Sequence, residues 1–338
     1  MKPTIKIAII DSGINNDSNY FNNITINGIS ICNINNKYEF IHGSYEDKCG
    51  HGTLCASVIK KESSNIEFFI VKIFDEYLNT NIQALEKALE YLLDIDVNII
   101  NMSISILQNK NLKHVKKLCN LLHKQDKIIV ASVTNGKLQS KPSTFRSVIG
   151  VKNCILKYEN SFCFSKYKRV NSVVDSLPYL HFKGNGVYEF FGMSNSYAAA
   201  KMTGIIANIL SNNPEVSYND VLKSLQLQSI HRFWNIFTLK KEQRYPSFKA
   251  ETKIYKKKYL NELEKMLADF FNLSDSKKLY TYSLYSQKIG GNMLFGHELI
   301  KYLETKYYFR FPDYTSISRY DLISIYSVYN LLEEQLKW

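Results

Sequence analysis

The chain has 338 residues, of which 45% are hydrophobic and 13% aromatic, enough for one large packed domain or for a large and a small one. Its formal net charge of +12 fits nucleic acid, an anionic membrane surface or an acidic peptide as partner. The lysines are scattered and no groove-reading motif occurs, so we expect a solvated basic surface and no nucleic-acid partner. No stretch is long and apolar enough to span a bilayer, and we expect no membrane partner.

The N-terminus lacks the apolar segment of a signal peptide. The six cysteines are Cys32, Cys49, Cys55, Cys119, Cys154 and Cys163. None of them forms a CxxC pair, so neither a zinc site nor a disulfide framework is expected. Free thiols without a signal peptide predict a cytoplasmic protein.

Short apolar runs alternate with amphipathic segments along the first 150 residues. The runs expected to form buried strands are 6–10, 66–74, 97–103, 127–132 and 148–151. The segments expected to form helices are 54–60, 82–93 and 112–124. Residues 15–47 are rich in Asn and Tyr, and we expect loops with short strands there. The alternation predicts an α/β fold, a doubly wound parallel sheet with helices on both faces.

Three side chains that could act in catalysis lie at the ends of these elements. Asp11 follows the first strand, and His51 lies between two glycines where a helix opens. Ser196 immediately precedes an apolar helix, where unpaired backbone N–H groups and the positive end of the helix dipole gather. Each has an ordinary alternative, since Asp11 could cap a turn, His51 could be structural and Ser196 could be an N-cap.

Taken together, the three side chains have the chemistry that acyl transfer needs. A serine hydroxyl becomes a nucleophile when a base takes its proton, and an imidazole oriented by a carboxylate is such a base. The side-chain amide of Asn135, which follows a predicted strand, is a candidate donor to an oxyanion.

Four motifs resemble those of the subtilisin-like serine proteases, in the same Asp, His, Ser order. The motifs are Ile9-Ile10-Asp11-Ser12-Gly13, Gly50-His51-Gly52-Thr53, Val130-Ala131-Ser132-Val133-Thr134-Asn135 and Asn195-Ser196-Tyr197-Ala198-Ala199. The resemblance covers residues 3 to about 230. Each motif alone is weak, but four of them in this order are specific.

The resemblance implies a role for each matching residue. Ser196 would be the nucleophile, His51 the general base and acid, and Asp11 the residue that orients the imidazole. Asn135 and the Ser196 backbone N–H would hold the oxyanion.

The resemblance also implies a substrate-binding edge. Ser103, Ile104 and Ser105 would pair with the substrate backbone as an added strand. Val133 and Thr134 replace small residues of the family, and their bulk predicts a narrowed pocket for the side chain before the scissile bond.

Other departures from the family pattern surround the serine. Ala200 stands in place of the usual proline, Lys201 in place of the usual histidine and Ser194 in place of the usual glycine. Since no catalytic group is missing, we expect an active serine endopeptidase with a peptide or protein substrate and no metal. The alternative is a catalytically inactive subtilase-like protein that binds peptides or docks a partner.

The Asp11 strand begins almost at Met1, so we expect no propeptide ahead of it. By analogy, this start is typical of an intracellular processing protease, such as one that trims leader peptides from ribosomally made peptides.

The sequence predicts a protease domain over 1–235, a polar linker over 236–250 and a small all-α domain over 251–338. The last part resembles a peptidyl or acyl carrier domain, with Gly290-Gly291-Asn292-Met293-Leu294 opening its second helix. Met293 occupies the position of the serine that carries phosphopantetheine. A thioether cannot be esterified by phosphate, so we expect no cofactor and a domain that could dock a protein partner.

Overall fold

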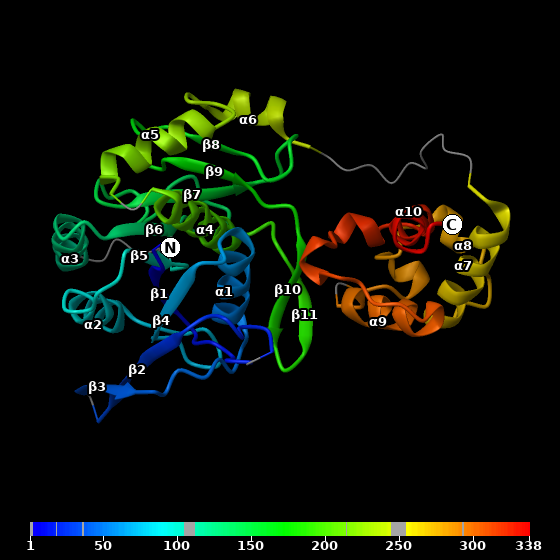
Figure 1. Cartoon of the computed structure of the whole chain (residues 1–338), viewed down its shortest axis with the longest axis horizontal. Helices are drawn as coiled ribbons and strands as arrows, with labels where there is room; N and C mark the ends of the chain where they lie inside the picture. Colours follow the sequence, from blue (N-terminus) through cyan, green and yellow to red (C-terminus); the bar gives the residue numbers. More distant parts are fainter. Residues whose placement is uncertain are drawn as a thin grey trace. The chain divides into compact units, whose positions relative to one another are not determined.

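The chain folds into two compact units, seen in a computed structural model that describes residues 3–17, 19–35, 37–104, 112–213, 215–244, 255–292 and 294–338 (Figure 1). The first, which we call the sheet unit, comprises Met1–Ser176, Phe182–Gly186 and Gly192–Gln243. The second, the helical unit, comprises Leu177–His181, Val187–Phe191 and Arg244–Trp338.

The strands of the sheet unit form a nine-stranded sheet in the order β3-β2-β4-β1-β5-β6-β7-β9-β8. They are β1 (Ile5–Asp11), β2 (Ile26–Ile34), β3 (Lys37–His42), β4 (Ile66–Lys72), β5 (Ile99–Met102), β6 (Ile128–Ser132), β7 (Ile149–Cys154), β8 (Phe162–Phe164) and β9 (Ser172–Asp175). Neighbours pair in parallel except at the two edges, where β3 and β8 run antiparallel. The order reverses between β1 and β5, and open α/β sheets bind ligands at the carboxyl ends of strands beside such a reversal.

Helices cover both faces of this sheet (Figure 1). Those of the sheet unit are α1 (His51–Glu62), α2 (Ile82–Tyr91), α3 (Lys113–Lys124), α4 (Asn195–Asn212), α5 (Tyr218–Gln228) and α6 (Ile236–Glu242). The α2 and α3 helices bury their apolar stripes with Ala8, Ile10 and Met102 on one face. The α1 and α4 helices pack together on the other, so strand residues alternate between two cores. The predicted doubly wound α/β fold is confirmed.

A glycine sets how closely α1 and α4 approach each other. A Cβ added at Gly204 of α4 would lie 2.5 Å from the Glu62 Cβ and 3.0 Å from the Ile59 carbonyl oxygen. Ile59 is the eighth residue after His51, and Gly204 is the eighth after Ser196. The contact therefore fixes a register in which residues equally far along the chain from His51 and from Ser196 lie opposite each other.

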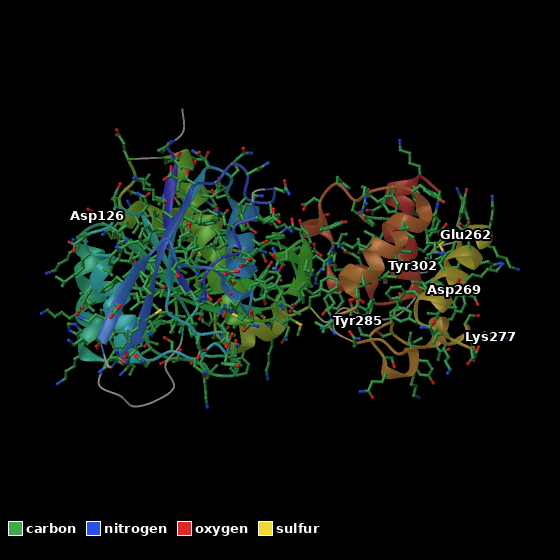
Figure 2. The ribbon with its side chains drawn as sticks, turned by 90° about the horizontal axis from the view of Figure 1, so that it is seen from below. Asp126, Glu262, Asp269, Lys277, Tyr285 and Tyr302 are labelled. Atoms are coloured by element: carbon green, nitrogen blue, oxygen red, sulfur yellow. The ribbon has the colours of Figure 1, made fainter. Side chains whose placement is uncertain are left out.

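The helical unit has an apolar core of its own. Its helices include α7 (Lys257–Phe270), α8 (Lys278–Thr281), α9 (Gly296–Tyr307) and α10 (Ile325–Leu336), with three 3-10 turns, η1 (Gln287–Ile289), η2 (Tyr314–Ser316) and η3 (Arg319–Leu322). Buried Leu263, Leu299 and Val328 form part of the core. Aromatic rings pack around it, among them Tyr285 and Tyr302, labelled in Figure 2.

A hairpin of β10 (Tyr179–Gly184) and β11 (Val187–Phe191) lies between β9 and α4 in the sequence. All of β11 and the first part of β10 belong to the helical unit. There the Leu180 N–H donates to the Ile317 carbonyl at 3.0 Å. Among the described residues, no helix has the length and apolar character that crossing a bilayer requires.

The boundary between the units differs from the predicted linker. Residues 236–242 form α6 within the sheet unit, where Asn235 caps the helix by accepting the Thr238 N–H at 2.9 Å. The helix buries none of its residues, and its Ile236 and Phe237 are exposed. Residues 245–250 of the predicted linker lie outside the described residues.

We expect Gly204→Ala to lower the free energy of unfolding by about 1–3 kcal/mol, because its methyl group overlaps α1. The loss should occur although alanine favours helices over glycine by about 1 kcal/mol. Urea unfolding measures the difference. Asn208→Ala, at an exposed site of α4, is the control and should change stability by less than about 0.5 kcal/mol. Unchanged stability of Gly204→Ala would contradict the close packing of α1 on α4.

Candidate active site

The aspartate and histidine of the predicted set lie together. Asp11 ends β1 and is fully buried, and His51 is the first residue of α1. The His51 Nδ1 lies 2.7 Å from the Asp11 Oδ1. Since a carboxylate only accepts, the Nδ1 carries the proton, and the Nε2 of the neutral ring is left as the basic atom.

Two glycines let the chain make this approach. A Cβ on Gly52 would lie 2.1 Å from the Gly13 carbonyl oxygen, so only glycine fits where α1 meets the loop after β1. The Gly52 N–H donates to the Ser12 Oγ at 2.9 Å. Gly50 precedes the helix with a φ of 84°, a left-handed conformation that glycine adopts without strain.

A buried carboxylate, Asp47, joins the same loop to the start of α1. Its Oδ1 accepts the Ser12 hydroxyl at 3.0 Å and the Gly50 N–H at 2.8 Å. Its Oδ2 accepts both the N–H and the hydroxyl of Thr53, at 2.9 and 2.7 Å. Asp47 therefore supplies the helix cap that Gly50 cannot provide.

Charge and burial oppose each other at these groups. Burial alone would lower the pKa of His51, but the charge and hydrogen bond of Asp11 and the charge of Asp47 outweigh it, so the pKa is raised. Burial alone would raise the pKa of Asp47, but its hydrogen bonds from Thr53, Gly50 and Ser12 lower it overall. The site thus favours an ionised Asp47 and a more basic imidazole.

Ser196 lies in the first turn of α4, half-buried. It is not the N-cap, because the Ser194 Oγ accepts the Tyr197 N–H at 3.2 Å and performs that function. A hydrogen bond of 3.0 Å from the Thr203 hydroxyl to the Asn101 side chain ties α4 to β5. The capping alternative for Ser196 is therefore wrong.

Asn135 lies beside the start of α4. Its Oδ1 accepts the Asn195 N–H at 3.0 Å, and the Asn195 Oδ1 in turn accepts the N–H of Asn153 in β7 at 2.7 Å. Because a backbone N–H can only donate, the partner atom of Asn135 is its oxygen, which leaves the NH₂ group as a donor next to Ser196. Asp11, His51, Asn135 and Ser196 thus come from elements whose ends meet at one edge of the sheet.

Comparison with known proteins agrees with this geometry. The model of the subtilase family (Peptidase_S8) matches residues 2–245. The chain belongs to the subtilase family. It is a subtilisin-like serine peptidase, and its substrate is a peptide or protein.

Two solved structures share the fold of the chain. Sphericase superposes with a TM-score of 0.56 at 17% identity, covering 67% of this chain and 83% of sphericase. The epidermin leader peptide processing serine protease (EpiP) from Staphylococcus aureus gives 0.54 at 17% identity, covering 67% of this chain and 69% of its own. No sequence among curated proteins matches this subtilase.

The predicted substrate-binding edge of the sheet unit follows β5. Ser103 is half-buried, and its hydroxyl lies 3.4 Å from the Asn101 Nδ2 and from the Cys55 Sγ. The Ile104 side chain is buried, and Ser105 lies outside the described residues.

The two residues before Asn135 are positioned by backbone hydrogen bonds. Val133 is buried, and its N–H donates to the Val151 carbonyl at 3.0 Å. Thr134 is half-buried, and its N–H donates to the Ser140 hydroxyl at 2.9 Å. The narrowed pocket that these residues predict stays a prediction.

Sequence reasoning missed Asp47 and Cys55. Asp47 stands three residues before the glycine that opens α1, and an acidic residue just ahead of a helix start is a signal that could have found it. The Cys55 thiol lies one helical turn after His51, and ligand atoms of Asp11, His51 and Cys55 lie within 4.8 Å of one another. Burial and the charge of Asp11 raise the pKa of Cys55 well above its usual value, so the neutral thiol is favoured.

We expect Asp47→Asn to lower the free energy of unfolding at neutral pH by about 1–3 kcal/mol, since the amide leaves a Thr53 donor unpaired. The lowered pKa of Asp47 stabilises the fold above the ordinary carboxyl pKa of about 4, and this stabilisation is lost as the pH falls further. The variant should therefore lose less stability than the parent on acidification below that pH. Urea unfolding across pH measures both effects.

Asp126→Asn, at an exposed site, is the control and should change neither value. A variant with the acid sensitivity of the parent would show that Asp47 does not link the β1 loop to α1 through its charge.

Proposed function

We propose that this subtilase is a serine endopeptidase that uses Ser196 as nucleophile, His51 as general base and acid, and Asp11 as the residue that orients the imidazole. The observation that carries the proposal is the 2.7 Å hydrogen bond between His51 and Asp11, at the start of a helix packed in register with the helix that bears Ser196. This register supports an approach of the Ser196 Oγ to the His51 Nε2.

In the proposed mechanism, the Ser196 Oγ attacks the scissile carbonyl carbon while the His51 Nε2 takes its proton. The oxyanion accepts hydrogen bonds from the Asn135 NH₂ group and the Ser196 backbone N–H. The imidazolium then gives its proton to the leaving amine, which departs and leaves an acyl-enzyme. Water, deprotonated by His51, releases the acid product and restores the serine hydroxyl.

The charge of Asp11 favours this proton transfer. It stabilises the imidazolium that forms when Ser196 loses its proton, consistent with the raised pKa of His51. Because the neutral ring is the base, the active fraction falls as the pH drops through this raised pKa.

We further propose a role in trimming leader peptides from ribosomally made peptides. The support is the fold shared with a protease whose printed name describes leader peptide processing. The cytoplasmic location predicted for such an enzyme agrees with six free thiols.

We infer that the helical unit recruits a protein partner as a carrier-like domain. Its helices α7, α9 and α10 surround one core, and Gly290 and Gly291 precede α9, as the resemblance to carrier domains expects. Met293, the residue at the phosphopantetheine position, lies outside the described residues. The absence of that cofactor stays a prediction from its side-chain chemistry.

We expect Ser196→Ala to abolish both peptide cleavage and labelling by a fluorophosphonate probe, because it removes the attacking oxygen. Ser194→Ala is the matched control in the same turn. It should lose about 1 kcal/mol of stability as a missing helix cap yet still take the label. A correctly folded parent that neither takes the label nor cleaves a peptide library would favour the inactive, peptide-binding alternative.

We expect Asn135→Ala to lower kcat by about 100- to 1,000-fold, or about 3 kcal/mol in the barrier, with a smaller change in KM. Its amide would act on the transition state more than on the bound substrate. Leu138→Ala, at an exposed site in the same loop, should leave kcat unchanged. Steady-state kinetics on a cleaved library peptide measures both, and equal kcat values for parent and Asn135→Ala would remove Asn135 from the oxyanion site.

A further inference from the structure

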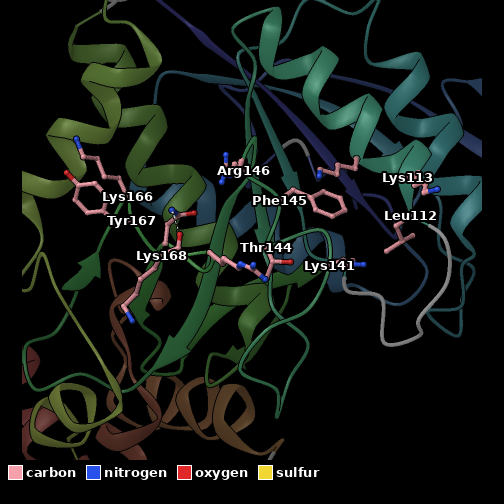
Figure 3. Close-up of a pocket in the computed structure, with 12 residues that line it drawn as sticks. Leu112, Lys113, Lys141, Thr144, Phe145, Arg146, Lys166, Tyr167 and Lys168 are labelled. Atoms are coloured by element: carbon pink, nitrogen blue, oxygen red, sulfur yellow. Dashed lines mark hydrogen bonds between the residues drawn. The ribbon is translucent and has the colours of Figure 1, made fainter.

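A cavity of about 870 Å³ in the sheet unit is lined by an unusual concentration of positive charge. Its walls come from the start of α3, from residues 141–146 and from residues 166–171 (Figure 3). Of the twelve lining residues that the structure describes, seven are Lys or Arg and none is Asp or Glu. The cations are Lys113, Lys116, Lys141, Arg146, Lys166, Lys168 and Arg169. We call this cavity the basic pocket.

The positive charge of the basic pocket is largely uncompensated. Leaving Lys113 aside, none of these cations forms an ion pair with a residue in the described part of the chain. Like charges gathered around a concave surface raise the local potential and attract an anion. The concentration therefore favours a ligand that carries several negative charges.

The loop over 166–171 is held in place by side-chain contacts. The Asn171 Oδ1 accepts the Gly150 N–H at 3.2 Å, and its Nδ2 donates to the Lys168 carbonyl at 2.9 Å. The ammonium group of Lys168 lies 4.4 Å from the centre of the Trp234 ring. These contacts hold the backbone of the loop, so the cations are presented from a defined segment.

The other two walls continue segments that flank the candidate active site. Lys113 opens α3, the helix that follows the predicted substrate edge beginning at Ser103. Lys141 follows Ser140, whose hydroxyl accepts the N–H of Thr134, the neighbour of Asn135. The wall over 141–146 is therefore tied to the loop that carries Asn135, which favours the peptide substrate as the ligand of the basic pocket.

We propose that the basic pocket binds an acidic segment of the peptide substrate, outside the residues that flank the scissile bond. This inference rests on the proposed endopeptidase function. Asp and Glu side chains supply the anions, and extended peptides suit a concave site of this volume. Nucleic acid is less favoured, because an 870 Å³ cavity is a local depression and a single strand needs a groove that tracks its backbone.

The test compares substrates that differ only in charge away from the cleaved bond. A library peptide that the full-length protein cleaves is resynthesised as two pairs of peptides. One pair carries four added Glu or four added Gln at the N-terminus, and the other pair carries them at the C-terminus. The pocket variant is Lys116→Gln, Arg146→Gln and Lys166→Gln, with one exposed change in each wall. The control variant is Lys37→Gln, Lys117→Gln and Lys124→Gln, which removes the same charge at exposed sites outside the pocket.

We expect the added Glu residues to matter at one terminus of the peptide. There, the parent and the control variant should cleave the Glu peptide with a kcat/KM about tenfold above that for the Gln peptide. The pocket variant should lose this preference and keep its kcat/KM on the Gln peptide. The preference of the parent should also fall when ionic strength rises from about 0.05 to about 0.5 M.

Two results would overturn the inference: no Glu preference in the parent at either end, or a preference that survives in the pocket variant. Binding of a poly-uridine RNA that the pocket variant weakens, without any Glu preference, would assign the basic pocket to nucleic acid instead.

Failure of the proposed function gives a different pattern. In that case no variant takes the fluorophosphonate label or cleaves either peptide, whatever its charge. Fluorescence anisotropy of the labelled Glu and Gln peptides with Ser196→Ala then tests the pocket by itself. Equal binding of the two peptides would reject the pocket assignment without reference to catalysis.

Discussion

The geometry of the candidate active site depends on the contact between the loop after β1 and the first turn of α1. Gly13 and Gly52 meet there at a distance that admits no side chain. Asp47 ties the same two segments through Ser12, Gly50 and Thr53. This contact brings His51 to Asp11, although β2 and β3 lie between their elements in the sequence. The glycines flanking the histidine are thus explained by backbone proximity and by a positive φ.

The order of the β-sheet then brings the remaining groups to the same edge. The strands on either side of the reversal between β1 and β5 end together, and α1 and α4 both start there. The Gly204 contact sets the register between the helices, while Asn195 joins Asn135 to β7. Residues far apart in the chain therefore need only short-range packing to hold a reactive geometry.

Much of this arrangement could be predicted from the sequence, because its signals are local. Buried parallel strands are continuous apolar runs, and the runs predicted over 6–10, 97–103 and 127–132 correspond to β1, β5 and β6. The order of the four motifs predicted the family, which the match over residues 2–245 confirms.

What the sequence did not predict depends on partners distant in the chain. The strands β8 and β9 have only three and four residues, too short for a clear period. The β10–β11 hairpin gave no signal that we recognised, and α6 has only seven residues, none of them buried, within the segment predicted as a linker. Asp47 has a local signal, its place just ahead of α1, but its tie to the loop after β1 comes from Ser12, 35 residues away in the sequence. Likewise, the cations of the basic pocket look scattered in the sequence and gather only when three separate segments meet.

The two units are interleaved along the chain. The helical unit takes Leu177–His181 and Val187–Phe191 from the middle of the sequence, before the chain returns to the sheet unit and forms α4. Tyr179 and Leu180 make backbone contacts with Ser318 and Ile317, so the C-terminal hundred residues close around a hairpin that precedes the serine. The helical unit therefore could not be added or removed by recombination at a single site in the gene. A gene that ends at codon 244 would encode the hairpin without the apolar residues that bury it.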